Sequence, residues 1–291
     1  MTRMLAFVAA LLLTAITVSS ACVAGSVTPL RFTIEPTGRA GHVQLNFKRA
    51  DAHGANSWGE SFAYGELAGL DLAALRAPGS HPIRFTAARE AGRVDCAGSG
   101  GNSLAIGTCS VTPDRGFLQF LAASGVGRPT EDQAFGLIAV DARRELVSAL
   151  ASARYPTPSV DKLIELSAVQ VTPAYVRGLA GQGYRPRTLS ELVEFAALKI
   201  TPEFIGSFAR AGYSDLEPDE LVQLKALNIT PQFVAGFERL GYRHLPVDTL
   251  VQLKALDITP EFVRAVQQGD ALPSPDHLVQ LRAVTRDLRK P

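Results

Sequence analysis

The chain has 291 residues, of which 46% are hydrophobic and 20% are charged. Its 29 Lys and Arg residues nearly balance 28 Asp and Glu residues, so the formal net charge is +1. This balance excludes a strongly basic chain that binds nucleic acid, and the apolar fraction is too high for a disordered protein. The length is enough for one or two domains with sizeable cores.

Residues 1–24 are predicted to be a signal peptide. Arg3 precedes an uncharged apolar run over residues 5–18, which is shorter than the ~20 residues of a membrane-spanning helix. Cleavage after Ala24 would release a soluble protein, whereas cleavage after Ala21 would place Cys22 first, as in a lipoprotein with a lipid anchor. Both alternatives predict export to the periplasm or cell envelope, with no transmembrane segment left after cleavage.

Residues 25–112 are predicted to form a small antiparallel β domain. Apolar and polar residues alternate over 32–34, 43–48 and 83–87, which is typical of half-buried strands, and Gly and Pro residues separate these segments. We expect about five short strands, with a short helix over residues 67–75. With the helical region described below, the predicted fold class is α+β.

Two cysteines of this β domain are predicted to face each other. If Asn102 and Ser103 form the turn of a hairpin, then Cys96 lies opposite Cys109, and directly opposed residues are close enough for a disulfide. The alternative is two buried thiols that act as small apolar side chains. The glycines at 98, 100 and 101 lack the context of a phosphate-binding loop, and we expect them in the turn.

The C-terminal half is a repeat array with a period of 29 residues. Three separate features recur at this spacing: the Thr-Pro words at 172, 201, 230 and 259, the Gly-Tyr words at 183, 212 and 241, and the leucines at 192, 221 and 250. The next leucine of this series, Leu278, follows after 28 residues. A fixed period of this length predicts an α-solenoid, in which neighbouring units bury each other's apolar faces.

One unit, residues 200–228, predicts two short helices. Thr201 caps the first helix with Pro202 at its first position, and Gly212 ends it in the left-handed conformation. A second helix begins after Glu217. Weaker matches at the same period extend the helical domain to residues 113–291, with decayed units at its front.

Polar residues recur at equivalent positions of the second helices and would form a ladder on one face. The ladder consists of Gln223, Lys225, Gln252, Lys254, Gln280 and Arg282. One interpretation is a ridge that binds an acidic partner. The other is a solvated helix face, which the smaller residues Ser167 and Ala196 at the lysine position favour.

No catalytic, cofactor-binding or metal-binding residue is predicted. The sequence contains none of the motifs Gly-x-Ser-x-Gly, His-Glu-x-x-His, P-loop or Cys-x-x-Cys. His42, His53 and His81 of the β domain lack a known ligand spacing even with Asp51 and Glu60 nearby, so we expect isolated surface histidines.

Two stretches carry a resemblance to a known class of proteins. They are residues 221–234 with Gly212-Tyr213, and the segment around Phe85, Arg89, Ala91-Gly92, Gly107 and Val111-Thr112-Pro113. Over roughly residues 80–288 the chain resembles bacterial exported proteins with degenerate helical repeats. It is also similar to the extracytoplasmic tails of membrane metallopeptidases related to the antirepressor sensors of β-lactam resistance. The resemblance implies an architecture, and the zinc motif and membrane spans of those peptidases are absent from the sequence.

Three hypotheses for function follow. The first is an exported, non-enzymatic interaction module whose solenoid binds an unidentified protein or peptide. The second is a regulatory or sensory accessory of a membrane peptidase or envelope signalling system. The third is an enzymatic or metal-binding β domain that uses its histidines.

Overall fold

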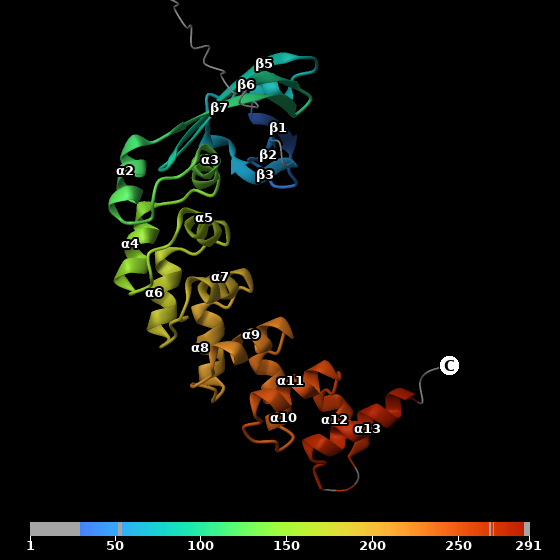
Figure 1. Cartoon of the computed structure of the whole chain (residues 1–291). Helices are drawn as coiled ribbons and strands as arrows, with labels where there is room; N and C mark the ends of the chain where they lie inside the picture. The colour runs from blue at the N-terminus through green and yellow to red at the C-terminus, as the bar shows by residue number, and fades with distance from the viewer. Residues whose placement is uncertain (1–29, 52–53, 268, 270, 288–291) are drawn as a thin grey trace, which may run out of the picture.

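A curled antiparallel sheet is followed by an array of short helices in the computed structural model (Figure 1). The structure describes residues 30–51, 54–267, 269 and 271–287, so the predicted signal peptide and Cys22 lie outside it. This arrangement confirms the predicted α+β class, a small β domain and then a helical array. In the described part of the chain, no helix is long and apolar enough to span a membrane.

The sheet has seven strands in the order β3-β2-β1-β7-β6-β5-β4, and every neighbouring pair is antiparallel. The strands are β1 (Leu30–Pro36), β2 (His42–Asp51), β3 (Gly54–Ala63), β4 (Leu67–Ala68), β5 (His81–Arg89), β6 (Gly92–Gly101) and β7 (Leu104–Pro113). A 3-10 turn (Tyr64–Glu66) precedes β4, and the short helix α1 (Leu72–Arg76) follows it.

The expectation of about five strands and of a helix over residues 67–75 was therefore wrong in detail. Strand β3 was missed because its only large apolar side chains are Trp58 and Phe62, too few for a clear alternation. The segment 67–75 is divided, since Leu67 and Ala68 pair with β5. Helix α1 begins only after Asp71, whose carboxylate accepts hydrogen bonds from two backbone N–H groups of its first turn.

The β6–β7 hairpin has the predicted register. Asn102 and Ser103 form its turn with positive φ angles of 53° and 68°, and Cys96 lies directly opposite Cys109. The two cysteines form a disulfide, so the alternative of two free thiols does not hold for this structure. Asn tolerates this left-handed conformation better than most residues, which suits it to a two-residue hairpin turn.

The glycines of this hairpin are not turn residues, which corrects the expectation. They lie within β6 and β7, where backbones approach closely. A Cβ on Gly98 would lie 2.0 Å from the carbonyl oxygen of Ile106, and one on Gly101 would lie 1.9 Å from that of Gly79. Glycine is required at these positions because any side chain would collide with neighbouring backbone.

The core of the sheet lies on one face and continues into the array. Phe32 and Phe85 pack edge to face with ring centroids 5.0 Å apart. Helix α3 (Glu131–Ala139) covers the same face, where Phe135 packs against Phe47 and Trp58. The buried apolar residues of the sheet and of the array thus form one continuous cluster.

Three arginines add polar contacts where the sheet meets the array. Arg49 of β2 binds Asp132 of α3 at 2.6 Å. Arg89 of β5 lies 3.8 Å from Asp141, which follows α3. Arg144, the first residue of α4, binds Glu90 at 2.7 Å. These ion pairs orient the first helices relative to the sheet.

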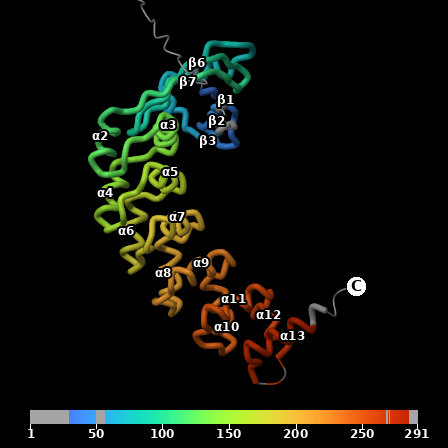
Figure 2. Tube along the Cα trace, viewed as in Figure 1, coloured from blue at the N-terminus to red at the C-terminus, as the bar shows by residue number. Residues whose placement is uncertain are grey.

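Twelve helices in the described part of the chain form the array, in two parallel rows (Figures 1 and 2). The first row contains α2 (Arg115–Ala123), α4 (Arg144–Ser152), α6 (Pro173–Gly181), α8 (Pro202–Arg210), α10 (Pro231–Glu238) and α12 (Pro260–Val266). The second row contains α3, α5 (Val160–Ala168), α7 (Leu189–Ala197), α9 (Pro218–Ala226), α11 (Val247–Ala255) and α13 (Pro275–Asp287). Helices pack on neighbours in the same row, as α4 does on α6 and α9 on α11.

The predicted helix ends of the repeat unit are confirmed. The Thr201 hydroxyl accepts a hydrogen bond from the backbone N–H of Phe204, and Pro202 occupies the first helical position. Gly212 has a φ of +88°, and the N–H of Tyr213 donates to the carbonyl of Phe208 at 3.0 Å. This is the Schellman arrangement, in which the left-handed residue satisfies the last carbonyls of the helix.

The decayed units at the front of the array keep the same backbone geometry. Gly125 and Arg154 precede Gly183 by two periods and one, and all three have positive φ. The second-row helices α3, α5, α7, α9 and α11 are also followed by left-handed residues at this spacing, although none of these is glycine: Asp141, Gln170, Lys199, Asn228 and Asp257. The repeat is therefore preserved in conformation where its sequence words have been lost.

Candidate interaction surface

Repeat tyrosines connect successive units of the array. The hydroxyl of Tyr213 donates to the carbonyl of Leu245 at 2.8 Å, and that of Tyr242 donates to the carbonyl of Pro273 at 2.6 Å. Tyr184 also contacts the backbone of Leu216, and this contact lowers the Tyr184 pKa, which burial raises more strongly. Burial raises the pKa of all three tyrosines. The Gly-Tyr words predicted only a helix stop, and nothing in them signalled this link between units.

The basic residues of the predicted ladder each lie on an aromatic ring of the preceding first-row helix. The Nζ atom of Lys225 is 4.7 Å from the ring centroid of Phe204, and that of Lys254 is 5.1 Å from Phe233. The guanidinium carbon of Arg282 is 5.0 Å from the ring of Phe262. These cation–π contacts hold the three side chains half-buried against the array.

The glutamines of the ladder are placed differently from the cations. Gln223, Gln252 and Gln280 are exposed, two positions before the basic residue of each unit. The ladder therefore combines cations fixed over rings with amide side chains that point away from the core. Amides can donate and accept hydrogen bonds, so this row can contact the backbone of a partner.

The ladder changes character toward the sheet. One unit before Lys225 its position is taken by Ala196, and the ring is that of Tyr175, whose hydroxyl donates to the carbonyl of Ile200 at 2.8 Å. One unit earlier again the pair is Leu146 and Ser167. The Ser167 side chain is buried, with 7% of the residue exposed, and its hydroxyl has no hydrogen-bond partner among the described residues.

A cavity of about 330 Å³ opens at this last pair. It lies where α4, α5 and α6 meet, after the end of α3. Its apolar wall includes Leu146 and its polar wall includes Asp141 and Ser167; the remaining lining residues are Val140, Arg143, Glu145, Gln170, Val171, Thr172 and Pro173. In the sequence, Ser167 stood out only as a departure from the lysine position.

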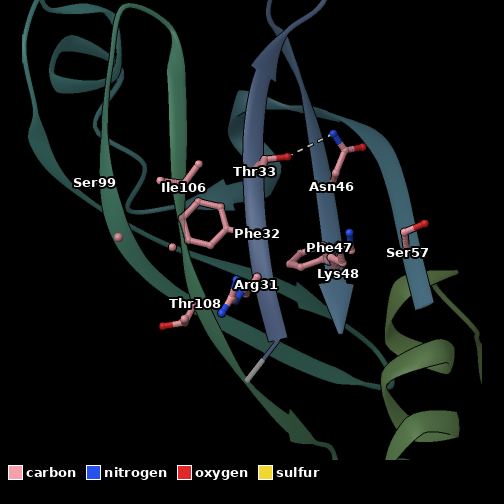
Figure 3. Close-up of a pocket in the computed structure, with 12 residues that line it drawn as sticks. Arg31, Phe32, Thr33, Asn46, Phe47, Lys48, Ser57, Ser99, Ile106 and Thr108 are labelled. Atoms are coloured by element: carbon pink, nitrogen blue, oxygen red, sulfur yellow. Dashed lines mark hydrogen bonds between the residues drawn. The ribbon is translucent and has the colours of Figure 1, made fainter. Parts of the chain in front are cut away.

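The outer face of the sheet carries a larger groove, of about 740 Å³ (Figure 3). Arg31 and Lys48 are directly opposed on β1 and β2, and Ile106 of β7 is 63% exposed on the same face. Asn46 donates to the Thr33 hydroxyl at 3.4 Å beside them. The alternation of apolar and polar residues predicted that this face of the sheet is exposed to solvent, and it did not predict a groove.

The structure gives His42 and His81 of the β domain local partners. His42 Nδ1 lies 3.0 Å from the carbonyl of Ala40, and His81 Nε2 lies 2.9 Å from that of Pro78. His53 lies outside the described residues. Within the described ranges, no group of three or more His, Cys, Asp or Glu side chains is placed to hold a metal ion.

No protein-family model matches the chain, and no curated protein or solved structure matches it either. The resemblance to exported repeat proteins and to tails of antirepressor-type peptidases therefore stays a prediction.

Proposed function

We propose that this chain is an exported, non-enzymatic interaction protein whose helical array binds a protein or peptide along its length. The observation that carries the proposal is the extended double row of helices, whose second row presents the exposed amides of Gln223, Gln252 and Gln280 at regular intervals. Arrays of this kind offer long surfaces on which each repeat contributes a few contacts.

The cysteine pair supports the exported part of the proposal. Disulfides persist in oxidising compartments such as the periplasm and are rare in the cytosol. Cys96 and Cys109 are bonded in a hairpin of the β domain. The predicted signal peptide of residues 1–24 provides the route to such a compartment.

Photo-crosslinking in the bacterial envelope tests the binding surface. A photoreactive residue is placed at position 223 or 252 of the full-length chain, and a control is placed at Glu35, which is exposed on the sheet. We expect one adduct of defined mass from positions 223 and 252, competed by unlabelled protein and absent at position 35. Folded protein with no saturable adduct at either array position would contradict the proposal.

Mass analysis of the same material tests export. The mature N-terminus should follow Ala24, or it should be an acylated Cys22, and Cys96 and Cys109 should resist thiol alkylation until reduced. An intact Met1 together with reactive Cys96 and Cys109 thiols would contradict export.

A further inference from the structure

The last unit of the array shows how a guanidinium group is bound within this fold. Arg282 donates from Nε to the carbonyl of Leu256 at 3.0 Å and from Nη2 to the Asp257 carboxylate at 2.9 Å. Its guanidinium carbon lies 5.0 Å from the centroid of the Phe262 ring. A backbone carbonyl, a carboxylate and an apolar platform thus form a complete receptor for an arginine side chain.

The same receptor recurs four periods earlier without its arginine. Counting back at the repeat spacing, Leu256 corresponds to Val140, Asp257 to Asp141 and Phe262 to Leu146. The position of Arg282 corresponds to Ser167. All four of these earlier residues line the cavity of about 330 Å³, so the carbonyl, carboxylate and apolar platform are retained around an open space.

The next unit lacks both the cation and the carboxylate. There Ala196 stands at the cation position and Gln170 at the position of Asp257, and the hydroxyl of Tyr175 donates to the Ile200 carbonyl. The cavity, by contrast, keeps the carboxylate of Asp141. The buried hydroxyl of Ser167, which lines the cavity, remains without a described partner. A buried polar group of this kind is stabilised by a ligand that completes its hydrogen bonds.

The carboxylates at the cavity can bind a cation from a partner. Asp141 accepts hydrogen bonds from Arg143 at 2.6 and 3.0 Å and lies 3.8 Å from Arg89. The Arg143 side chain is 60% exposed and can move toward solvent. Glu145 at the cavity wall adds a second carboxylate.

We propose that the cavity formed by Val140, Asp141, Leu146 and Ser167 binds an arginine side chain of the partner protein or peptide. This inference rests on the proposed function, because it specifies the chemistry of the partner. The guanidinium would donate to the Val140 carbonyl, the Asp141 carboxylate and the Ser167 hydroxyl while it lies flat over Leu146. Arginine fits better than lysine because its planar fork reaches several acceptors at once.

A variant whose own side chain would occupy the cavity tests the receptor without any partner. Ser167→Arg recreates the residue found in the last unit, and we expect a higher urea midpoint of unfolding. Ala196→Arg is the matched control, and it should lower the midpoint because Gln170 stands in that unit at the position of Asp257 and offers no carboxylate to the added charge. A Ser167→Arg protein that unfolds at lower urea, or fails to fold, would overturn the proposal.

Direct binding to the wild-type chain provides the second test. A capped Gly-Arg-Gly peptide is titrated by nuclear magnetic resonance against the exported form of the full chain, beside the same peptide with citrulline, the uncharged analogue. We expect saturable shifts at residues 140–146 and 167 with arginine, at least about tenfold weaker binding of citrulline, a difference of about 1.4 kcal/mol, and no binding to Ser167→Arg. Equal binding of the two peptides would overturn the inference. That result is independent of the photo-crosslinking experiment, so the two proposals fail separately.

Discussion

The hydroxyl of Tyr213 donates a hydrogen bond to the carbonyl of Leu245, 32 residues further along the chain. Its ring also packs edge to face on Phe208, five residues earlier. One side chain therefore closes the helix of its own unit and holds the loop of the next. Short helices are marginal in isolation, so contacts of this kind between units determine the stability of the array.

Tyr213→Phe should destabilise the array while it leaves the packing on Phe208 in place. The Leu245 carbonyl would lose this buried partner, and such a loss costs about 1–3 kcal/mol of unfolding free energy. Tyr64→Phe is the control, because the Tyr64 hydroxyl lies in an exposed contact with Arg76 at 3.3 Å. Urea unfolding followed by circular dichroism measures both. Equal effects of the two variants would refute the role assigned to Tyr213.

Stability of the array should fall as the pH rises above about 10. Burial raises the pKa of Tyr155, Tyr175, Tyr184, Tyr213 and Tyr242 in the folded chain. The unfolded chain releases these protons near pH 10, where the folded chain still binds them, so folding is increasingly penalised above that pH. Below it the contribution is fully present.

The measurement is the urea midpoint at a series of pH values from neutral to alkaline. Tyr175→Phe removes one of the five groups, so the decline in midpoint should become shallower for this variant. A Tyr175→Phe curve parallel to that of the wild type would rule out the assigned titration.

Lys225→Met should lower the unfolding free energy by about 0.5–1 kcal/mol, because methionine keeps apolar contact with Phe204 and loses the cation–π attraction. Gln223→Met is the control two positions away, where the side chain is exposed and little change is expected. Chemical denaturation of both variants gives the comparison. Indistinguishable midpoints for the two variants would mean that the lysine adds no stability through its charge.

Lys199→Gly should stabilise the chain. Lys199 ends α7 with a φ of +57°, and the left-handed conformation costs an L-residue roughly 1–2 kcal/mol. The greater unfolded-state entropy of glycine offsets about half of this gain. Asn228→Gly, at the equivalent position with a φ of +50°, should give less, since asparagine tolerates this conformation.

A helical control separates this effect from glycine content. Glu194→Gly lies inside α7 and should destabilise the chain by about 1 kcal/mol. Thermal unfolding ranks the three variants. A Lys199→Gly chain that melts below the wild-type chain would contradict a cost of the left-handed conformation at this position.

Local patterns predicted much of this fold. The Thr-Pro words marked helix starts because a hydroxyl cap and a missing N–H act within one turn, and Gly212 marked a stop because its left-handed conformation is local too. The opposition of Cys96 and Cys109 followed from counting outward from one turn. Strand β3 was not predicted, because its pairing with β2 defines it and few of its own residues are typical of a strand.

The sequence was sufficient for features that depend on residues within one turn of a helix or one hairpin: the period of the array, its helix ends and the disulfide register. Contacts between residues a whole unit apart needed the folded structure, because side-chain direction and the rotation between units are set by packing. The contact of Lys225 with the Phe204 ring and the place of Ser167 in the wall of a cavity both depend on how neighbouring helices pack. One repeat position can therefore carry a packed cation in one unit and line a cavity in another.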